Sequence, residues 1–407
     1  MTNPLSGSAH DNAHGTARDS AHDAEIRLAI QTRLDDLTKP KGSLGKLEDY
    51  AEKLSVIQGL VPPRIRRKAV FVMAGDHGVV NQGVSLYPRE VTAQMVHNFM
   101  GGGAGINVLA KACGFDVFAV DAGVDGDFPA WPVKGQAQPD GSRAPGFFPM
   151  KAVRGTRNFA TEPAMSPQEF QTCLDNGARL ADFAAAEGYD IVAIGDMGIG
   201  NTTSAAAILV ALGFDPDQMI DRGTGIDDAM LALKHKVVVD AVKARGPFGS
   251  GKVADTGTGK TAGGGQPGGH GLGAGLSGSE EALRIGASFA GPEQATAAGL
   301  ILGLRGKGIA CILDGFPVTA AGALAWQIDP SVQRFLFAGH QSRVKGHRPV
   351  LDAMGLEPAV CLDMRLGEGT GAVIGGFMVE LGAKIANEMA TFSGMAITRA
   401  TADEKDF

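Results

Sequence analysis

The stretch AVFVMAGDHG, residues 69–78, decides the fold, because it is a short apolar run that ends in glycine and charged residues. Runs of the same form recur along the chain; they are DVFAVDAGV (116–124), IVAIGDMGIG (191–200), ACILDGFP (310–317) and FLFAGHQS (335–342). Strands that are apolar almost throughout are typical of a parallel sheet with both faces covered. The five runs therefore predict such a sheet.

Helical patterns separate these runs. Residues 88–100 begin with a proline and repeat apolar residues at helical spacing. Residues 227–242 carry acids in their first turn and an apolar stripe of Met230, Leu233, Val237 and Ala241. Strands that alternate with helices predict an α/β fold, a Rossmann-like parallel sheet with helices on both faces. Ligands bind beyond the carboxyl ends of the strands in such sheets, so we expect a site at that edge.

The two ends of the chain show a different pattern. Apolar residues at helical spacing over 25–37 and 47–57 predict two amphipathic helices before the first strand. The expected parts are a disordered tail at 1–24, a small helical domain at 25–60 completed by about 380–407, and an α/β domain at 61–379. The Gly- and Pro-rich segments 126–150 and 246–279 are expected to be flexible surface inserts, because they contain few large apolar residues.

Composition narrows the class of protein. The 407 residues carry a net charge of −7 without a basic block, which argues against a nucleic-acid partner. The four cysteines lie far apart and form no CxxC pair, so we expect reduced thiols. There is no apolar run long enough to span a membrane and no secretory signal at the N-terminus. The sequence therefore predicts a soluble, cytoplasmic protein.

The stretch DTGTGKTA, residues 255–262, superficially resembles the phosphate-binding loop of an ATPase. That motif needs a glycine five residues before Gly259, and Ala254 stands there instead. The stretch follows no predicted strand and runs into more glycines, whereas the motif must lead from a strand into a helix. We interpret it as a linker.

Two other loops are better placed to bind an anion. GDMGIGNTTSAAAILVAL (195–212) follows a predicted strand and opens a helix, so its glycines, Asn201 and threonines put amides and hydroxyls at a helix N-terminus. A phosphate is favoured there, although a simple Asn/Thr helix cap has the same spacing. DRGTGIDD (221–228) is a second such turn, with Lys236 either a counter-charge or an ordinary surface lysine.

A third loop, MRLGEGTGAVIGGFMVELG (364–382), places Glu368 between glycines at the start of a helix. The glycines allow a ligand to approach the carboxylate closely. A general base would need an apolar pocket that raises its pKa, whereas a solvated acid is also common at a helix start. The residues alone leave both interpretations open.

The loops together resemble a known family, the nicotinate-nucleotide:dimethylbenzimidazole phosphoribosyltransferases of cobalamin lower-ligand synthesis. The resemblance covers about residues 25–390 and rests on seven motifs in order: KPKGSLGKLE (39–48), AGDHGV (74–79), GVSLYPREVTAQMV (83–96), GDMGIGNTT (195–203), ILDGFPVTAA (312–321), GHQSRVKGH (339–347) and RLGEGTGA (365–372).

The resemblance implies the substrates, nicotinate mononucleotide and 5,6-dimethylbenzimidazole, a homodimer, and no cofactor or metal. It implies Glu368 as the catalytic base. The remaining implied residues are Asp196 for catalysis; Gly198, Gly200, Asn201, Thr202, Thr203, Gly223, Thr224, Gly225 and Lys236 for the ribose phosphate; and Tyr87, Gln94, Met95, Asp314, Phe316 and Leu366 for the base.

Two positions depart from the family pattern. Asp196 stands where family members commonly have a glutamate, and its side chain is one methylene shorter than that of glutamate. Tyr87 occupies the position of a pocket serine that is found in some members. The main alternative is a metal-dependent hydrolase that uses Asp76, His77 and His340, but these histidines lack the helical i, i+4 spacing of a familiar zinc motif. A non-catalytic nucleotide- or azole-binding module is the other alternative.

Overall fold

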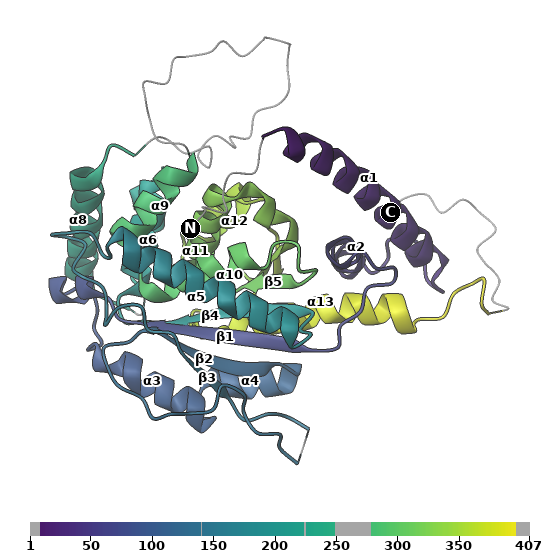
Figure 1. Cartoon of the computed structure of the whole chain (residues 1–407), viewed down its shortest axis with the longest axis horizontal. Coiled ribbons are helices and arrows are strands. Elements are labelled where there is room, and N and C mark those ends of the chain that lie inside the picture. Colours follow the sequence, from purple (N-terminus) through teal and green to yellow (C-terminus); the bar gives the residue numbers. More distant parts are fainter. Residues whose placement is uncertain (1–8, 140, 224, 249–277, 396–407) are drawn as a thin grey trace, which may run out of the picture.

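One parallel sheet forms the centre of the molecule (Figure 1). The structure is a computed structural model that describes residues 9–139, 141–223, 225–248 and 278–395. Within these residues seven strands pair in the order β3-β2-β1-β4-β5-β6-β7. Their bounds are β1 Lys68–Gly75, β2 Asp116–Gly123, β3 Gly146–Pro149, β4 Ile191–Met197, β5 Ala310–Leu313, β6 Leu336–His340 and β7 Pro358–Val360. The predicted parallel α/β class is confirmed.

The five predicted runs form β1, β2, β4, β5 and β6, whereas the short edge strands β3 and β7 were not predicted. β3 lies inside the segment 126–150, which was expected to be a flexible insert. That segment instead packs Phe128, Trp131 and Phe147 against one another, with ring centroids 5.1–5.9 Å apart. Residues 249–277, including the stretch 255–262, lie outside the described part of the chain.

Helices cover both faces of the sheet (Figure 1). Their bounds are α1 Ala9–Asp36, α2 Lys46–Gln58, α3 Glu90–Gly101, α4 Gly105–Cys113, α5 Pro167–Ala186, α6 Asn201–Ala211, α7 Pro216–Met219, α8 Asp228–Arg245, α9 Gly278–Phe289, α10 Pro292–Gly303, α11 Phe316–Ile328, α12 His347–Ala353 and α13 Thr370–Glu388, with 3₁₀ helices η1 Gly78–Gln82 and η3 Pro330–Phe335. No helix in the described ranges is long and apolar enough to cross a membrane.

The alternation of side chains along β1 explains the two helical layers. Phe71 and Met73 point into a core shared with α5, α6, α10 and α11. Val70 and Val72 point to the opposite face, into a core shared with α3, α4 and α13. Successive side chains of a strand face opposite sides, so an all-apolar strand needs a helical layer on each.

Residues from near the two ends of the chain pack together. Ile30, Leu34 and Leu37 of the N-terminal segment form one buried cluster with Ala51 of α2 and Ala386 of α13. α1 begins at Ala9, so the segment predicted to be a disordered tail is helical from that residue onward. α13 also contacts β4 and β6 of the central sheet. The division of the chain into two domains stays a prediction.

The strand order fixes where a ligand can enter. The order runs outward in both directions from β1 and β4, which pair with each other. In doubly wound sheets the loops that leave such a neighbouring pair diverge and open a crevice at the carboxyl edge. Here those loops carry His77 after β1 and residues 198–200 after β4.

Candidate functional site

The loop between β4 and α6 lies at this crevice. Gly200 adopts a left-handed conformation with φ 95° and starts α6. In the first turn, the amides of Asn201 and Thr203 donate to the carbonyls of Gly198 and Gly200 over 3.1 and 3.0 Å. Thr202 is partly exposed in that turn, and its Oγ1 accepts a hydrogen bond of 3.0 Å from Lys234 Nζ of α8. Gly223 lies beside both, since a Cβ on it would stand 3.1 Å from Thr202 Oγ1. The arrangement places a hydroxyl and an ammonium group together at a helix N-terminus.

Lys234, and not the predicted Lys236, is the lysine at this turn. Lys234 is buried, and burial lowers its pKa to about 8 by disfavouring the ammonium form. Lys236 is exposed and pairs with Asp240 one turn further along α8. The sequence held a signal, because Lys234 shares a helical face with Val237 and Ala241. The predicted stripe included Leu233 instead, which is 40% exposed.

The other residues of the second turn contribute less. Gly225 is exposed and no heavy atom of its surroundings would touch a Cβ placed on it. Thr224, also predicted to bind the phosphate, lies outside the described residues. Among the described residues of this loop that were predicted to bind the phosphate, Gly223 is therefore the one that lies against Thr202.

Asp196, at the end of β4, is buried beneath the loop. Asn201 donates a side-chain hydrogen bond to its Oδ2, whereas its Oδ1 has no hydrogen-bond partner among the described residues. Burial raises the pKa of Asp196 well above its usual range, and the neighbouring carboxylates of Asp314, Glu293 and Glu368 raise it further. Asn201 opposes the shift. This carboxyl group therefore favours its protonated form.

Glu368 lies in a tight turn before α13. It adopts φ 64° between Gly367 at 86° and Gly369 at 89°, and a left-handed conformation is strained for a residue with a side chain. Its amide donates to the carbonyl of Asp196 over 3.2 Å. A Cβ on Gly195 would overlap the backbone of Glu368 and Gly369, so the turn rests directly on β4.

The Glu368 side chain is only 5% exposed and points to the start of α4. Its Oε2 accepts the amide hydrogen of Ile106 over 3.3 Å. Burial raises the pKa of this carboxyl group, the charge of Asp314 adds to the shift, and the Ile106 amide opposes it. This is the environment that a general base requires, and it removes the alternative of a solvated helix-start acid.

Asp314 and Phe316 were predicted to contact the base, and the structure gives them other roles. Asp314 is fully buried and accepts the amides of Gly369, Gly371 and Ala372 over 2.7–3.0 Å. It therefore caps α13 and fixes the turn that carries Glu368. Phe316 is 1% exposed within the core under α11, where a ligand does not reach it.

The remaining predicted base contacts are exposed or partly exposed. Tyr87 is 49% and Leu366 60% exposed, Gln94 is exposed and Met95 half-buried. Leu366 packs at the start of α4, where a Cβ on Gly105 would stand 2.9 Å from its Cδ2. Thr92 accepts the amide of Ile199 and so ties α3 to the loop after β4. Exposed apolar side chains at such an edge are typical of a binding surface.

Two residues of the alternative metal site, Asp76 and His77, have protein partners, and His340 Nε2 lies 3.6 Å from Asp314 Oδ1. Asp76 accepts the amide of Asp125 over 2.8 Å, and His77 contacts Glu293 at 2.8 Å. His347, a further possible ligand, accepts the amide of Ser342 and bonds to Thr319, and burial lowers its pKa to about 3. Across the described ranges no three His, Cys, Asp or Glu side chains group as a metal site would require.

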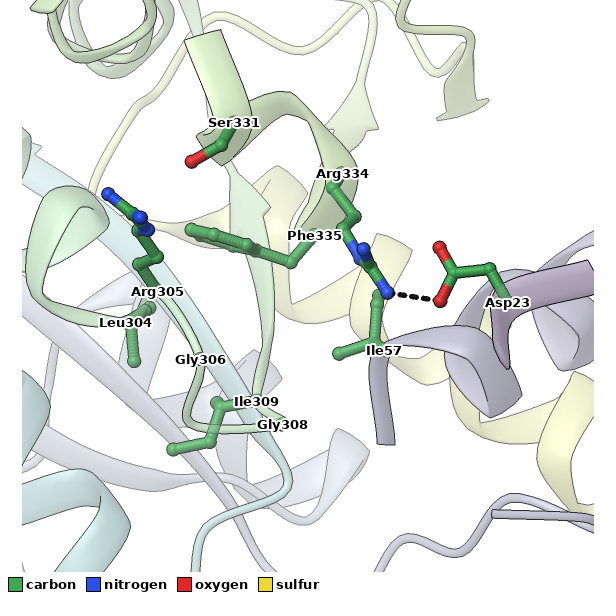
Figure 2. A pocket seen from close by; sticks show the side chains of 10 residues that line it. All are labelled: Asp23, Ile57, Leu304, Arg305, Gly306, Gly308, Ile309, Ser331, Arg334 and Phe335. Atoms are coloured by element: carbon green, nitrogen blue, oxygen red, sulfur yellow. Dashed lines mark hydrogen bonds and ion pairs between the residues drawn. The ribbon is translucent and has the colours of Figure 1, made fainter. Parts of the chain in front are cut away.

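A cavity of about 510 Å³ lies at the opposite edge of the sheet (Figure 2). Its lining includes the segment before β5 and the helix η3 before β6. Its two arginines already have carboxylate partners, since Arg305 pairs with Asp329 and Arg334 with Asp23. The crevice at the carboxyl edge, which contains Glu368, Asp196 and Lys234, is therefore the stronger candidate for the functional site.

Comparison with known proteins identifies the family of this chain. A family described as phosphoribosyltransferase matches residues 20–265 and 271–397. The nicotinate-nucleotide–dimethylbenzimidazole phosphoribosyltransferase of Geobacter sulfurreducens is 42% identical over 371 residues, 91% of this chain and 93% of that protein. The Thermus thermophilus protein of the same name is 40% identical, over 93% and 99% of the two chains. This chain belongs to that phosphoribosyltransferase family.

Structural comparison gives the same result. The crystal structure of CobT from Thermus thermophilus matches with a TM-score of 0.78 and 40% identity, over 92% of this chain and 100% of that one. The predicted family and the predicted enzyme class, a phosphoribosyltransferase, are confirmed in preference to the hydrolase and the binding module.

Proposed function

We propose that this phosphoribosyltransferase moves the phosphoribosyl group of nicotinate mononucleotide to 5,6-dimethylbenzimidazole, giving α-ribazole 5′-phosphate and nicotinate. The names of its relatives supply the substrates. The observation that carries the proposal is the buried Glu368 carboxylate with a raised pKa, whose turn rests on the strand that leads to the anion-binding loop.

The chemistry needs two things from the protein. The C1′–N bond of the nucleotide breaks with its electron pair going to the pyridine nitrogen, which leaves an oxocarbenium-like sugar. A ring nitrogen of the azole attacks the opposite face of C1′, so the β-linkage becomes α. The azole then carries one N–H proton too many, and Glu368 accepts it. The loop 198–203, Gly223 and Lys234 hold the phosphate meanwhile.

Asp196 has a different role from Glu368 in this proposal. Burial and the neighbouring carboxylates raise the pKa of its carboxyl group well above the usual range, which favours a hydrogen-bonding role over that of the base. Its unpartnered Oδ1 faces the turn of Glu368, where a Cβ on Gly367 would stand 3.9 Å away. We propose that it hydrogen-bonds a ribose hydroxyl or a water in the crevice.

The direct test mixes the protein with nicotinate mononucleotide and 5,6-dimethylbenzimidazole and follows free nicotinate and the new nucleoside phosphate by chromatography. We expect both products in equal amounts. The rate should not change with EDTA, because no step uses a metal. An absence of nicotinate over a range of pH and substrate concentration would rule out the proposed function.

Lys234→Met is expected to raise the KM for nicotinate mononucleotide about 10- to 100-fold. The reason is that a charge-assisted hydrogen bond contributes about 1.5–3 kcal/mol. The KM for the azole should stay near that of the parent. Lys236→Met is the matched control, because that exposed lysine pairs with Asp240 and is expected to change neither KM. Equal effects of the two substitutions would contradict the assignment of Lys234.

The pH dependence of kcat/KM should be bell-shaped. The acid limb reflects protonation of Glu368, whose raised pKa places it above the ordinary glutamate range, and the rate falls about tenfold per pH unit below it. The alkaline limb reflects loss of the Lys234 charge near pH 8. Lys234→Met should lack the alkaline limb, which a profile of each enzyme over about pH 5 to 10 would test.

The assembly and location of the enzyme are also proposals. We propose a homodimer and a cytoplasmic location, on the basis of the resemblance to the family. Exposed apolar side chains such as Leu86 and Leu362, each more than half exposed, offer surface for a partner copy or a ligand. Light scattering of the purified protein would measure the mass in solution.

A further inference from the structure

A buried histidine–glutamate pair lies beside the proposed phosphate loop and takes no part in the chemistry above. His77 Nε2 stands 2.8 Å from Glu293 Oε1, and both side chains are at most 1% exposed. His77 follows β1, while Glu293 lies in the first turn of α10. Burying a carboxylate and an imidazole is unfavourable unless each is paired, so the pair has a defined geometry.

The histidine ring forms part of the floor of the loop after β4. A Cβ on Gly198 would stand 3.1 Å from His77 Nε2, and one on Gly200 would stand 3.3 Å from His77 Cβ. The loop backbone therefore lies over the imidazole at Gly198 and over the Cβ of His77 at Gly200. Other atoms are closer still, since a Cβ on Gly198 would stand 2.5 Å from the carbonyl oxygen of Gly75 and one on Gly200 would stand 2.8 Å from Val80 Cγ2. His77 is therefore one of the groups on which the height of the loop depends.

The glutamate is held equally closely. A Cβ on Gly75 would stand 2.7 Å from Glu293 Oε2, and the same oxygen lies against Gly291. That oxygen has no hydrogen-bond partner among the described residues, so the contact with His77 is the one that orients the carboxylate. Removing the histidine would take away the hydrogen-bond partner of Oε1 as well, in a side chain that is fully buried.

The next residue of α10 holds the same loop from the other side. Gln294 Nε2 donates to the carbonyl of Asn201 over 3.0 Å. Its Oε1 accepts from the hydroxyl of Ser204 over 2.6 Å and from the amide of Gly291 over 3.0 Å. The first turn of α10 therefore contacts the start of α6 directly through Gln294, and the glycine turn only indirectly through His77.

We propose that His77 and Glu293 are positioning residues, which hold the loop 198–201 at the height where its amides meet the sugar phosphate. This inference rests on the proposed function for its substrate. The pair contacts no substrate itself; it acts by fixing the backbone on which Gly198, Gly200 and Asn201 sit. Misplacement of a binding group by about 1 Å can lower a rate by about a hundredfold.

The test compares Glu293→Ala, Glu293→Gln and His77→Ala in the full-length chain. Each alanine variant is expected to raise the KM for nicotinate mononucleotide about a hundredfold and to leave the KM for the azole unchanged. Glu293→Gln should restore most of the affinity, because its amide oxygen can still accept a hydrogen bond from His77. Calorimetric titration with ribose 5-phosphate should show the same order of affinities without turnover.

A matched control separates positioning from plain stability. Lys39 and Glu48 form another buried pair, 2.8 Å apart and 5% and 8% exposed, at the start of α2. Glu48→Ala should lower the unfolding temperature as Glu293→Ala does, but keep the parent KM. The inference is overturned if the variants at 77 and 293 lose only stability, or if Glu293→Gln is no better than Glu293→Ala. Should Glu293→Ala not fold, His77→Ala decides, since it leaves α10 intact.

The outcome is distinguishable from a failure of the proposed function. If the parent releases no nicotinate, the function is wrong, yet the ribose 5-phosphate titrations still report whether the pair positions the loop. If the parent is active and both alanine variants bind ribose 5-phosphate as tightly as the parent, the positioning role alone is wrong.

Discussion

Replacing Glu368 by glutamine is expected to lower kcat by about 10²–10⁴-fold while leaving the affinity for both substrates within a few-fold of the parent. The substitution keeps the size of the side chain and an oxygen that can accept the amide of Ile106. It removes only the ability to take a proton. The loss therefore falls on the step in which the azole nitrogen is deprotonated, and binding should persist.

The measurement combines steady-state turnover with calorimetric titration of each substrate. Asp363→Asn is a suitable control, because Asp363 is an acid of the same segment that also adopts a left-handed conformation but is exposed. It should leave kcat unchanged. A Glu368→Gln enzyme that keeps more than a tenth of the parent turnover would show that another group accepts the proton.

The sequence predicted well those elements whose own residues show the pattern of the secondary structure that they form. β1 and β4 are apolar over their whole length because they are central strands, so their composition alone marks them. β3 and β7 are edge strands of four and three residues, which leave too short a pattern to recognise. What forms them is pairing with β2 and β6, which is not written in their own residues.

The site shows the same division. Glu368 and the loop 198–203 were recognisable as candidates because glycines surround them at a helix start, whereas the role of Glu368 as the base was implied by the family resemblance. Lys234 was missed because an apolar neighbour, Leu233, fitted the stripe equally well, and only packing decides which one turns inward. The pairing of His77 with Glu293 joins residues more than two hundred positions apart, so no spacing could reveal it.

Asp314 is the clearest case of a role that only the fold reveals, and its replacement is expected to have the second large effect. Asp314→Ala should lower the free energy of unfolding by about 2–5 kcal/mol, because three buried amides lose their acceptor. It should also lower kcat by about a hundredfold in the protein that remains folded. Gly369, one of the three donors, follows Glu368 directly, so the catalytic turn would move with the helix start.

The two effects can be separated by denaturant unfolding and by kcat measured well below the unfolding transition. Ser166→Ala is the control, since Ser166 caps α5 through the amide of Glu169 over 3.2 Å. It should cost about 1 kcal/mol of stability and leave turnover unchanged. If Asp314→Ala were as active as Ser166→Ala, the position of Glu368 could not depend on the cap of α13. The strain of three successive left-handed residues would then have to be held by β4 alone, through the carbonyl of Asp196 and the close approach of Gly195.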